Sequence, residues 1–343
     1  MDRFEFDTAP FTPLGGAWER LILVFTFDIL SQGRTLSRGA EGNGWEGGLG
    51  ALYFGDNFEF GGYAYLVNQE KFNVSNGLRA DLDNPIVWSL YGKYDKDPFY
   101  LAFEFENIFG KLSDLDDPLP SVIGDSEIDI TTENFLFVGR LGYNPPTNRV
   151  DRIVTEFGWS SGDDSATPDK LEGNAIFFNN AYVIDNLLFK HVIPNIYAVE
   201  GSVINSGYVK AHTTLNLSNS LYFTPQILFA WTDERNALLG TDGLTPLPAV
   251  NKYLGTELEG TLTWKIMDHL WFDLIGSYIF AGDGLDDLLS QRALLEGTIS
   301  DLNESNPSSS IYSIQGRFIF TLDNIIKTWK GNSSLNQRAY FGL

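Results

Sequence analysis

Residues 158–162 (GWSSG) match the G-x-S-x-G pattern, in which a serine nucleophile sits on a turn from a strand into a helix. Here the motif leads into Asp163-Asp164 and a proline-containing loop instead. Of the three histidines, only His212 falls on an inward position of a predicted strand. A membrane-embedded hydrolase built on Ser160 and His212 is therefore a minor alternative, and we expect the protein not to be an enzyme.

Two other patterns could bind a ligand. Residues 42–47 (GNGWEG) match G-x-G-x-x-G, but a dinucleotide site needs a strand before the glycines and a helix after them, and here a strand follows. Asp283, Asp286 and Asp287 could offer oxygens to Ca²⁺ but lack the full EF-hand spacing, so a solvated loop tip is favoured. The histidines share no metal-ligand spacing. The sequence thus predicts no catalytic residue, no cofactor and no other metal site.

The composition excludes several classes of protein. The 343 residues hold 45 Asp and Glu against 23 Lys and Arg, a formal charge of −22, so a nucleic-acid partner is not expected. Without cysteine there is neither a disulfide nor a thiolate metal site. The longest apolar stretch, residues 21–27, is too short for a membrane-spanning helix. The first residues lack the pattern of a signal peptide, so either a signal was removed or the chain begins within a longer product.

A period of two residues is the main structural signal. After Pro98, the large apolar side chains of Phe99, Leu101, Phe103 and Phe105 alternate with smaller or polar ones that include two glutamates. A strand places these two sets on opposite faces. Most segments of this kind approach the 9–11 residues of a tilted membrane-spanning strand. Twelve of them cover about residues 20–30, 45–54, 58–67, 86–94, 99–107, 134–143, 150–159, 206–217, 222–232, 253–266, 270–281 and 311–321.

The connections between these segments alternate between short and long, as in outer-membrane barrels. We therefore predict an all-β protein, a closed antiparallel transmembrane β-barrel of about 12 strands, with 14 or more as the alternative. Short periplasmic turns and long extracellular loops would join the strands. The expected divisions are an N-terminal segment 1–19, a barrel 20–321 with a long loop 160–205, and a C-terminal tail 322–343.

The charged residues of the strands share one parity, and the large apolar residues share the other. A lysine or arginine on the lipid face at mid-membrane costs about 2–4 kcal/mol, so we assign the charged parity to the lumen. Because these inward charges nearly balance, most of the net charge falls on loops, turns and tails. The predicted pore-lining residues are Lys93, Glu104, Glu106, Arg140, Arg152, Glu156, Lys210, Glu257, Glu259, Lys265, Asp273 and Arg317.

Aromatic residues add two further expectations. Tyr63, Tyr65, Tyr91 and Tyr100 could form narrowing or sugar-stacking surfaces in the lumen. Indole rings favour the headgroup boundary, and several tryptophans lie near predicted strand ends. The predicted aromatic girdle consists of Trp45, Trp88, Trp159, Trp231, Trp264 and Trp271.

Residues 254–266 (LGTELEGTLTWKI), with 270–274 (LWFDL), 277–283 (SYIFAGD) and 222–231 (YFTPQILFAW), resemble the strands of alginate-export-like outer-membrane porins. The resemblance covers mainly the last 180 residues. It implies a monomeric barrel that passes solutes across the outer membrane.

Two regions outside the strands have unusual patterns. The loop 160–205 contains the apolar runs 176–178, 182–184 and 187–189, so we expect it to fold into the lumen or across the mouth and narrow the pore. An extra strand pair is the alternative. In the tail, Leu322, Ile325, Ile326 and Trp329 have helical spacing and predict a short amphipathic helix, with a strand over 338–343 as the alternative.

The sequence therefore predicts a multi-pass outer-membrane porin or channel of a Gram-negative bacterium. It would contact membrane lipid and lipopolysaccharide and pass small hydrophilic solutes passively. An acidic mouth concentrates cations and repels polyanions, so neutral or cationic solutes are favoured. The alternatives are a polysaccharide export channel and a non-conducting barrel scaffold that docks a periplasmic or surface partner.

Overall fold

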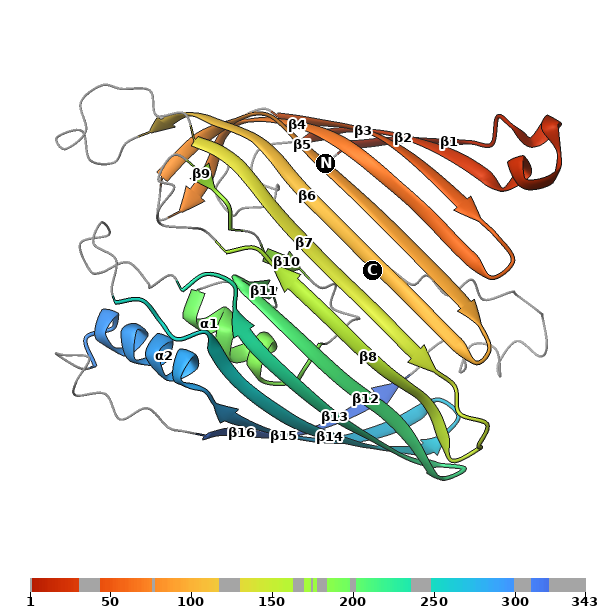
Figure 1. Ribbon diagram of the computed structural model, residues 1–343, viewed down its shortest axis with the longest axis vertical. Helices are drawn as coiled ribbons and strands as arrows, with labels where there is room; N and C mark the ends of the chain where they lie inside the picture. Colours follow the sequence, from red (N-terminus) through yellow and green to blue (C-terminus); the bar gives the residue numbers. More distant parts are fainter. Residues whose placement is uncertain are drawn as a thin grey trace. The chain divides into compact units, whose positions relative to one another are not determined.

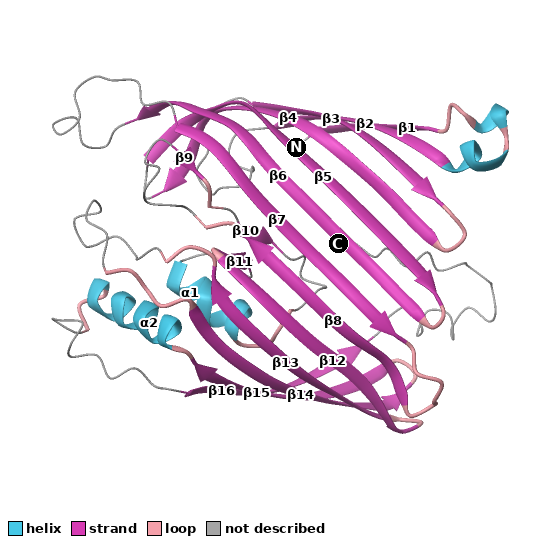
Figure 2. Ribbon diagram, in the orientation of Figure 1, coloured by secondary structure: helices cyan, strands magenta, loops and turns pink. Residues whose placement is uncertain are grey.

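The computed structural model describes residues 2–30, 44–75, 78–116, 130–162, 170–173, 175–177, 184–197, 202–235, 248–298 and 310–320. The chain divides into two compact units. Unit 1 contains residues 1–140 and 160–174, and unit 2 contains residues 141–159 and 175–343. Each unit consists mainly of long strands laid side by side (Figure 1 and Figure 2).

Unit 1 is a meander in which each strand is hydrogen-bonded to the next one along the chain. The pairs from β1–β2 to β5–β6 are antiparallel. The 3-10 helices η1 (Thr12–Leu14) and η2 (Gly16–Arg20) join the first two strands, and the short β9 (Lys170–Leu171) pairs in parallel with β7. The strands are β1 (Asp2–Thr8), β2 (Leu21–Leu30), β3 (Gly44–Phe54), β4 (Phe58–Ser75), β5 (Leu78–Lys96), β6 (Phe99–Asp116) and most of β7 (Ile130–Tyr143).

Unit 2 continues the same kind of meander, with antiparallel pairs from β12–β13 to β15–β16. It also contains the two-stranded sheet β10 (Ala175–Phe177) with β11 (Ser202–Ile204). Its helices are the π-helix η3 (Leu188–Val192), α1 (Ile193–Tyr197) and α2 (Asp283–Leu295). Its long strands are β8 (Val150–Ser160), β12 (Ser206–Ser218), β13 (Leu221–Thr232), β14 (Tyr253–Met267), β15 (Leu270–Ala281) and β16 (Ser310–Phe320).

Side-chain exposure alternates along the strands and gives each unit an apolar and a polar face. On β14, Leu258 and Trp264 are 43% and 51% exposed, whereas Glu257 is fully buried. Directly paired residues lie on the same face, and Leu258 pairs with Tyr278, which pairs with Tyr312. We call the face that carries Glu257, and its counterpart in unit 1, the polar face. The exposed large hydrophobic side chains of the long strands lie mostly on the other, apolar face, the reverse of a water-soluble β protein.

All twelve predicted strands are present, but several boundaries differ. β4, β5 and β6 reach 18 or 19 residues and extend into segments that were predicted as loops because they are polar. Pairing between strands uses backbone hydrogen bonds, so it can continue through polar sequence. The segment 1–19 contains the unpredicted strand β1, and the loop 282–310 contains the unpredicted helix α2. The tail 322–343 lies outside the described residues. The two units together hold thirteen strands of the meander, and their closure into a barrel remains a prediction.

Candidate functional site

The candidate site lies on the polar face of unit 2, where residues 184–197 pack against β12, β13 and β14. We call these residues the inserted segment; they include η3 and α1. Leu188, Phe189 and Ile193 are at most 2% exposed, and the Phe189 ring lies 5.6 Å from the ring of Tyr208 on β12. Burial of such a side chain contributes about 1.5–3 kcal/mol, which explains why this part of the loop is so apolar.

Asp185 organises the first turn of the inserted segment. Its carboxylate accepts hydrogen bonds from the backbone N–H of Phe189 at 3.0 Å and of Lys190 at 3.2 Å. A short polar side chain that satisfies the N–H groups of the following turn fixes how that turn begins. Asp185 is itself only 1% exposed, and burial raises its pKa to about 6 against the opposing effect of these hydrogen bonds and of Lys210.

Two glutamates of β14 also bind the backbone of the inserted segment. Glu257 Oε2 accepts from the N–H of Leu188 at 2.8 Å, and Glu259 Oε2 accepts from the N–H of Asn186 at 3.1 Å. Glu257 Oε1, however, is buried with no hydrogen-bond partner. Glu257 therefore holds the segment through one oxygen and buries the other without compensation.

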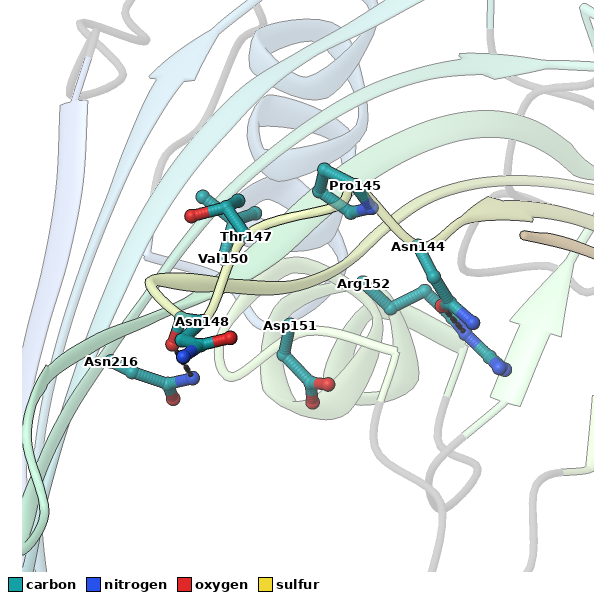
Figure 3. A pocket seen from close by; sticks show the side chains of 8 residues that line it. All are labelled: Asn144, Pro145, Thr147, Asn148, Val150, Asp151, Arg152 and Asn216. Carbon is teal, nitrogen blue, oxygen red and sulfur yellow. Dashed lines mark hydrogen bonds between the residues drawn. The ribbon is translucent and has the colours of Figure 1, made fainter. Parts of the chain in front are cut away.

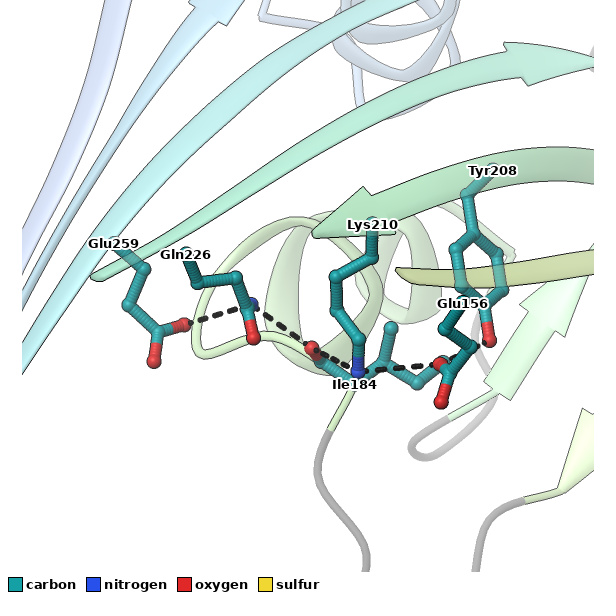
Figure 4. Close-up of polar contacts among 6 residues, drawn as sticks. All are labelled: Glu156, Ile184, Tyr208, Lys210, Gln226 and Glu259. Carbon is teal, nitrogen blue, oxygen red and sulfur yellow. Dashed lines mark hydrogen bonds and ion pairs between the residues drawn. The ribbon is translucent and has the colours of Figure 1, made fainter. Parts of the chain in front are cut away.

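Lys210 on β12 supplies the positive charge of the site (Figure 4). Its Nζ lies 3.1 Å from Glu156 Oε1 on β8 and donates to the backbone oxygen of Ile184 at 3.2 Å. The Tyr208 hydroxyl donates to the same Glu156 oxygen at 2.8 Å. The two charged side chains are 2% and 1% exposed, so both depend on these contacts to offset the loss of water.

Gln226 and Gly158 complete the site from two further strands. The Gln226 amide on β13 donates to the Ile184 oxygen at 3.0 Å and to Glu259 at 3.3 Å, so it connects the inserted segment to β14 (Figure 4). A Cβ at Gly158 on β8 would lie 2.1 Å from the ring of Tyr208. Glycine is therefore needed there to let Tyr208 lie flat and reach Glu156.

The sequence analysis identified part of this site. It assigned Glu156, Lys210, Glu257 and Glu259 to the lumen, and the structure brings these four together on one face. It missed Asp185, Tyr208 and Gln226. For Asp185 the available signal was an Asp-Asn pair directly before the apolar run 187–189, which is a turn-starting pattern. That these residues line a pore remains a prediction.

Three further predicted lumen residues of unit 2, Lys265, Asp273 and Arg317, lie near the 267–270 turn. Asp273 on β15 accepts from Thr263 at 2.7 Å and pairs with Arg317 on β16 at 2.8 Å. Lys265 pairs with Asp268 at 2.7 Å and lies 5.6 Å from the centre of the Trp271 ring. Trp271 is the direct strand partner of Lys265 and therefore lies on the polar face. Its assignment to a lipid-facing girdle was wrong, because its parity is that of Asp273.

The other predicted girdle tryptophans lie on the apolar parity of their strands. Trp45 and Trp264 are 38% and 51% exposed. Trp88 donates to Asn107 at 2.8 Å, Trp159 donates to Asp233 at 2.8 Å, and the Trp231 ring lies 6.3 Å from the Phe157 ring at a tilt. An indole with its body on an apolar surface and its N–H on a polar partner suits a membrane boundary. Their girdle role remains a prediction.

The polar face of unit 1 is built differently. Lys93 Nζ on β5 lies 3.5 Å from Glu59 Oε1 on β4, and the two side chains are 34% and 40% exposed. The Tyr63 ring lies 5.7 Å from Tyr65 and 6.4 Å from Tyr91. The predicted lumen residues Glu104, Glu106 and Arg140 belong to the following strands, and Tyr91 pairs directly with Glu104. Tyr100 lies near the start of β6.

A polar pocket of about 580 Å³ lies at the turn that joins β7 to β8 (Figure 3). Arg152, a predicted lumen residue, donates through Nε to Asn144 at 2.7 Å, and Asn216 donates to the Asn148 oxygen at 2.9 Å. Asp151 lines the same pocket and shares the exposed parity of Ile153. The expectation that the charged strand residues share one parity therefore fails at Asp151, one of the first residues of β8, next to the turn.

The other candidate motifs do not form sites in the described part of the chain. Asp283, Asp286 and Asp287 lie on α2, where Asp287 accepts from Asn251, and no group of three or more potential ligands there could hold a metal ion. Ser160 is fully buried at the end of β8, which is followed by no helix up to Gly162. The G-x-G-x-x-G match leads into β3, as expected, although its first two residues fall outside the described ranges. None of the described helices combines the length and hydropathy that crossing a membrane requires.

Comparisons with known proteins give only distant likenesses. No family model and no curated protein sequence matches the chain. Among solved structures, a mutant of the ferric enterobactin receptor PfeA of Pseudomonas aeruginosa matches with a TM-score of 0.45 and 8% identity, over 78% of this chain and 40% of the receptor. The NanC porin matches with a TM-score of 0.31 and 9% identity over 87% and 98% of the two chains. A FadL homologue of Pseudomonas aeruginosa matches with a TM-score of 0.35 and 11% identity over 77% and 68%. At such low scores no property of these proteins is transferred to the chain.

Proposed function

We propose that the chain closes into an outer-membrane β-barrel of a Gram-negative bacterium and passes small hydrophilic solutes by diffusion. The observation that supports this most is the two-faced character of the strands. Ile314 and Tyr312 are 77% and 75% exposed on the apolar face of β16, whereas Lys210 and Glu156 are buried on the polar face. Such an arrangement is stable when lipid covers the apolar face and water or protein covers the polar one.

Closure would follow from the chemistry of the backbone. In hydrocarbon every N–H and C=O must be paired within the protein, and a β-sheet meets this condition only when its edges close on each other. The polar face would then surround an aqueous lumen. The formal charge of −22 favours cationic or neutral solutes over polyanions, so a role in alginate export fits this chain less well than general diffusion.

The inserted segment would set the width of this lumen. It is fixed to the polar face by buried apolar side chains and by hydrogen bonds from three strands. Deleting residues 174–190 should therefore raise the single-channel conductance. Unchanged conductance with an intact barrel would remove the constriction from the proposal.

The same contacts favour a second candidate, a barrel that does not conduct and instead serves as a scaffold. A segment held this firmly against the polar face could fill the lumen altogether. Planar-bilayer recording of the full chain separates the two functions. Cation-selective steps support the pore, whereas silence from protein shown to be folded and inserted supports the scaffold.

A further inference from the structure

We propose that protonation of the carboxylates around the inserted segment controls its seating, so that acidic medium holds the segment on the polar face and alkaline medium loosens it. The seating can be measured whether or not the protein conducts, and only its effect on conductance rests on the proposed function. The cluster consists of Asp185 on the segment, Glu156 on β8, and Glu257 and Glu259 on β14.

The geometry places like charges on both sides of one buried contact. Asp185 and Glu257 are 1% and 0% exposed and belong to the segment and to the strand beneath it. Lys210 is the buried cation near them among the described residues; it contacts Glu156 and the Ile184 oxygen and also attracts Asp185 and Glu259. Four carboxylates against one ammonium leave excess negative charge in a region shielded from water, and this excess disfavours seating when all of them are ionised.

The remaining groups around Asp185 do not reverse this balance. Gln226 on β13 is neutral, and the Tyr208 hydroxyl on β12 is occupied as a donor to Glu156. On the segment, Lys190 offers its backbone N–H to Asp185. Burial and Lys190 lower the pKa of His191, so protonation of His191 at acidic pH opposes seating. His191 is exposed, however, and water screens its charge, so its effect is weaker than that of the buried Asp185.

The direction of the effect follows from Asp185. Its pKa is about 6 when buried, against an ordinary value of 3.8. Seating is therefore most stable below pH 3.8 and is weakened progressively until the pH has passed 6. For this one group, the ratio of seated to released segment should fall about tenfold between pH 5 and pH 8. Glu257 is buried beneath the segment, and release of the segment would expose its carboxylate to water. Ionisation of Glu257 therefore also favours release.

A pair of reporter cysteines can measure seating, because the natural chain has none. Ile193 is fully buried in α1, and Asn195 is exposed on the same helix. We would label Ile193→Cys and Asn195→Cys separately with a methanethiosulfonate reagent, in the full chain reconstituted in vesicles, from pH 4.5 to pH 8. The pH dependence of the thiol cancels in the ratio of the Ile193→Cys rate to the Asn195→Cys rate. We expect the titration of Asp185 to raise this ratio about tenfold from pH 5 to pH 8.

Neutral replacements identify the group responsible. Asp185→Asn keeps an oxygen acceptor and should remove the Asp185 part of the rise, and Glu257→Gln should also reduce the rise. Asp268→Asn, in an exposed turn, should leave the rise unchanged. A flat ratio in the original chain, a ratio that falls with pH, or a full rise retained in both Asp185→Asn and Glu257→Gln would overturn the proposal.

Bilayer recording of the same variants separates this inference from the proposed function. If both hold, mean conductance rises from pH 5 to pH 8 and rises less in Asp185→Asn. Labelling that follows pH in a silent protein supports the seating and rejects the pore. Conducting protein with pH-independent labelling supports the pore and rejects the seating.

Discussion

Lys93 with Glu59 and Lys210 with Glu156 are similar ion pairs in very different surroundings. In unit 1 the pair is separated by 3.5 Å, with side chains 34% and 40% exposed. In unit 2 the separation is 3.1 Å and the exposures are 2% and 1%. Both pairs occupy the polar parity of their strands, so the alternation of the sequence does not distinguish them. The inserted segment does, because it covers the face on which Lys210 lies.

This difference teaches that a polar face can be a solvated wall or a buried binding surface, depending on what covers it. A solvated pair contributes about 0–1 kcal/mol, because water competes for both charges. A covered pair is costly to form and more costly to break. Mutations that are equivalent in the sequence should therefore have unequal effects in the two units.

The largest difference should come from removing the lysines. Lys210→Met should lower the free energy of unfolding by about 3–5 kcal/mol, because it leaves Glu156 buried without its cation. Lys93→Met should change it by about 1 kcal/mol or less. Guanidinium unfolding in detergent micelles measures both, and equal effects would contradict the comparison.

Cavity formation should give the next largest effect. Leu188→Ala removes a fully buried side chain and should cost about 2–4 kcal/mol. Leu49→Ala, at a position 61% exposed on the apolar face of β3, is the matched control and should cost much less in the same micelles. A Leu188→Ala variant as stable as the control would show that the inserted segment does not pack on the sheet.

The pH dependence of stability should be smaller and should change sign between two aspartates. Because the pKa of Asp185 is raised to about 6, its contribution is lost as the pH rises, by about 2 kcal/mol from pH 4 to pH 8. The pKa of Asp268 is lowered by its hydrogen bond to Lys265, so its small contribution is lost as the pH falls. Unfolding curves of Asp185→Asn from pH 4 to pH 8, and of Asp268→Asn from pH 5 down to about pH 2, should differ from the original chain in opposite directions.

The smallest effect should be on ion selectivity. A double change of Glu104→Gln and Glu106→Gln in unit 1 should reduce the ratio of cation to anion permeability by roughly twofold, because these carboxylates lie on the polar face outside the inserted segment's contacts. Glu257→Gln should change the ratio less, because the inserted segment covers Glu257. Reversal potentials in a salt gradient provide the measurement. A larger change with Glu257→Gln would invert the comparison.

Strand positions and faces could be predicted because the division into an apolar and a polar face acts on every second residue. Phe99 to Phe105 and Leu258 to Trp264 show this alternation without any tertiary information. Trp271 was misassigned because nearness to a strand end was given more weight than parity. Asp185 was missed because its role depends on Glu257 and Lys210, which the fold brings to it from 72 and 25 residues away in the sequence. Patterns among neighbouring residues do not reveal contacts between residues that are distant in the sequence.

Spin labels on single introduced cysteines test the division into two faces most directly. In vesicles, labels at Leu101 on β6 and Leu262 on β14 should be accessible to oxygen, which dissolves in lipid. Labels at the neighbouring Ala102 and Thr263 should be more accessible to a water-soluble nickel chelate. Equal accessibility of neighbours, or the reverse pattern, would contradict the assignment of the apolar face to lipid and of the polar face to water.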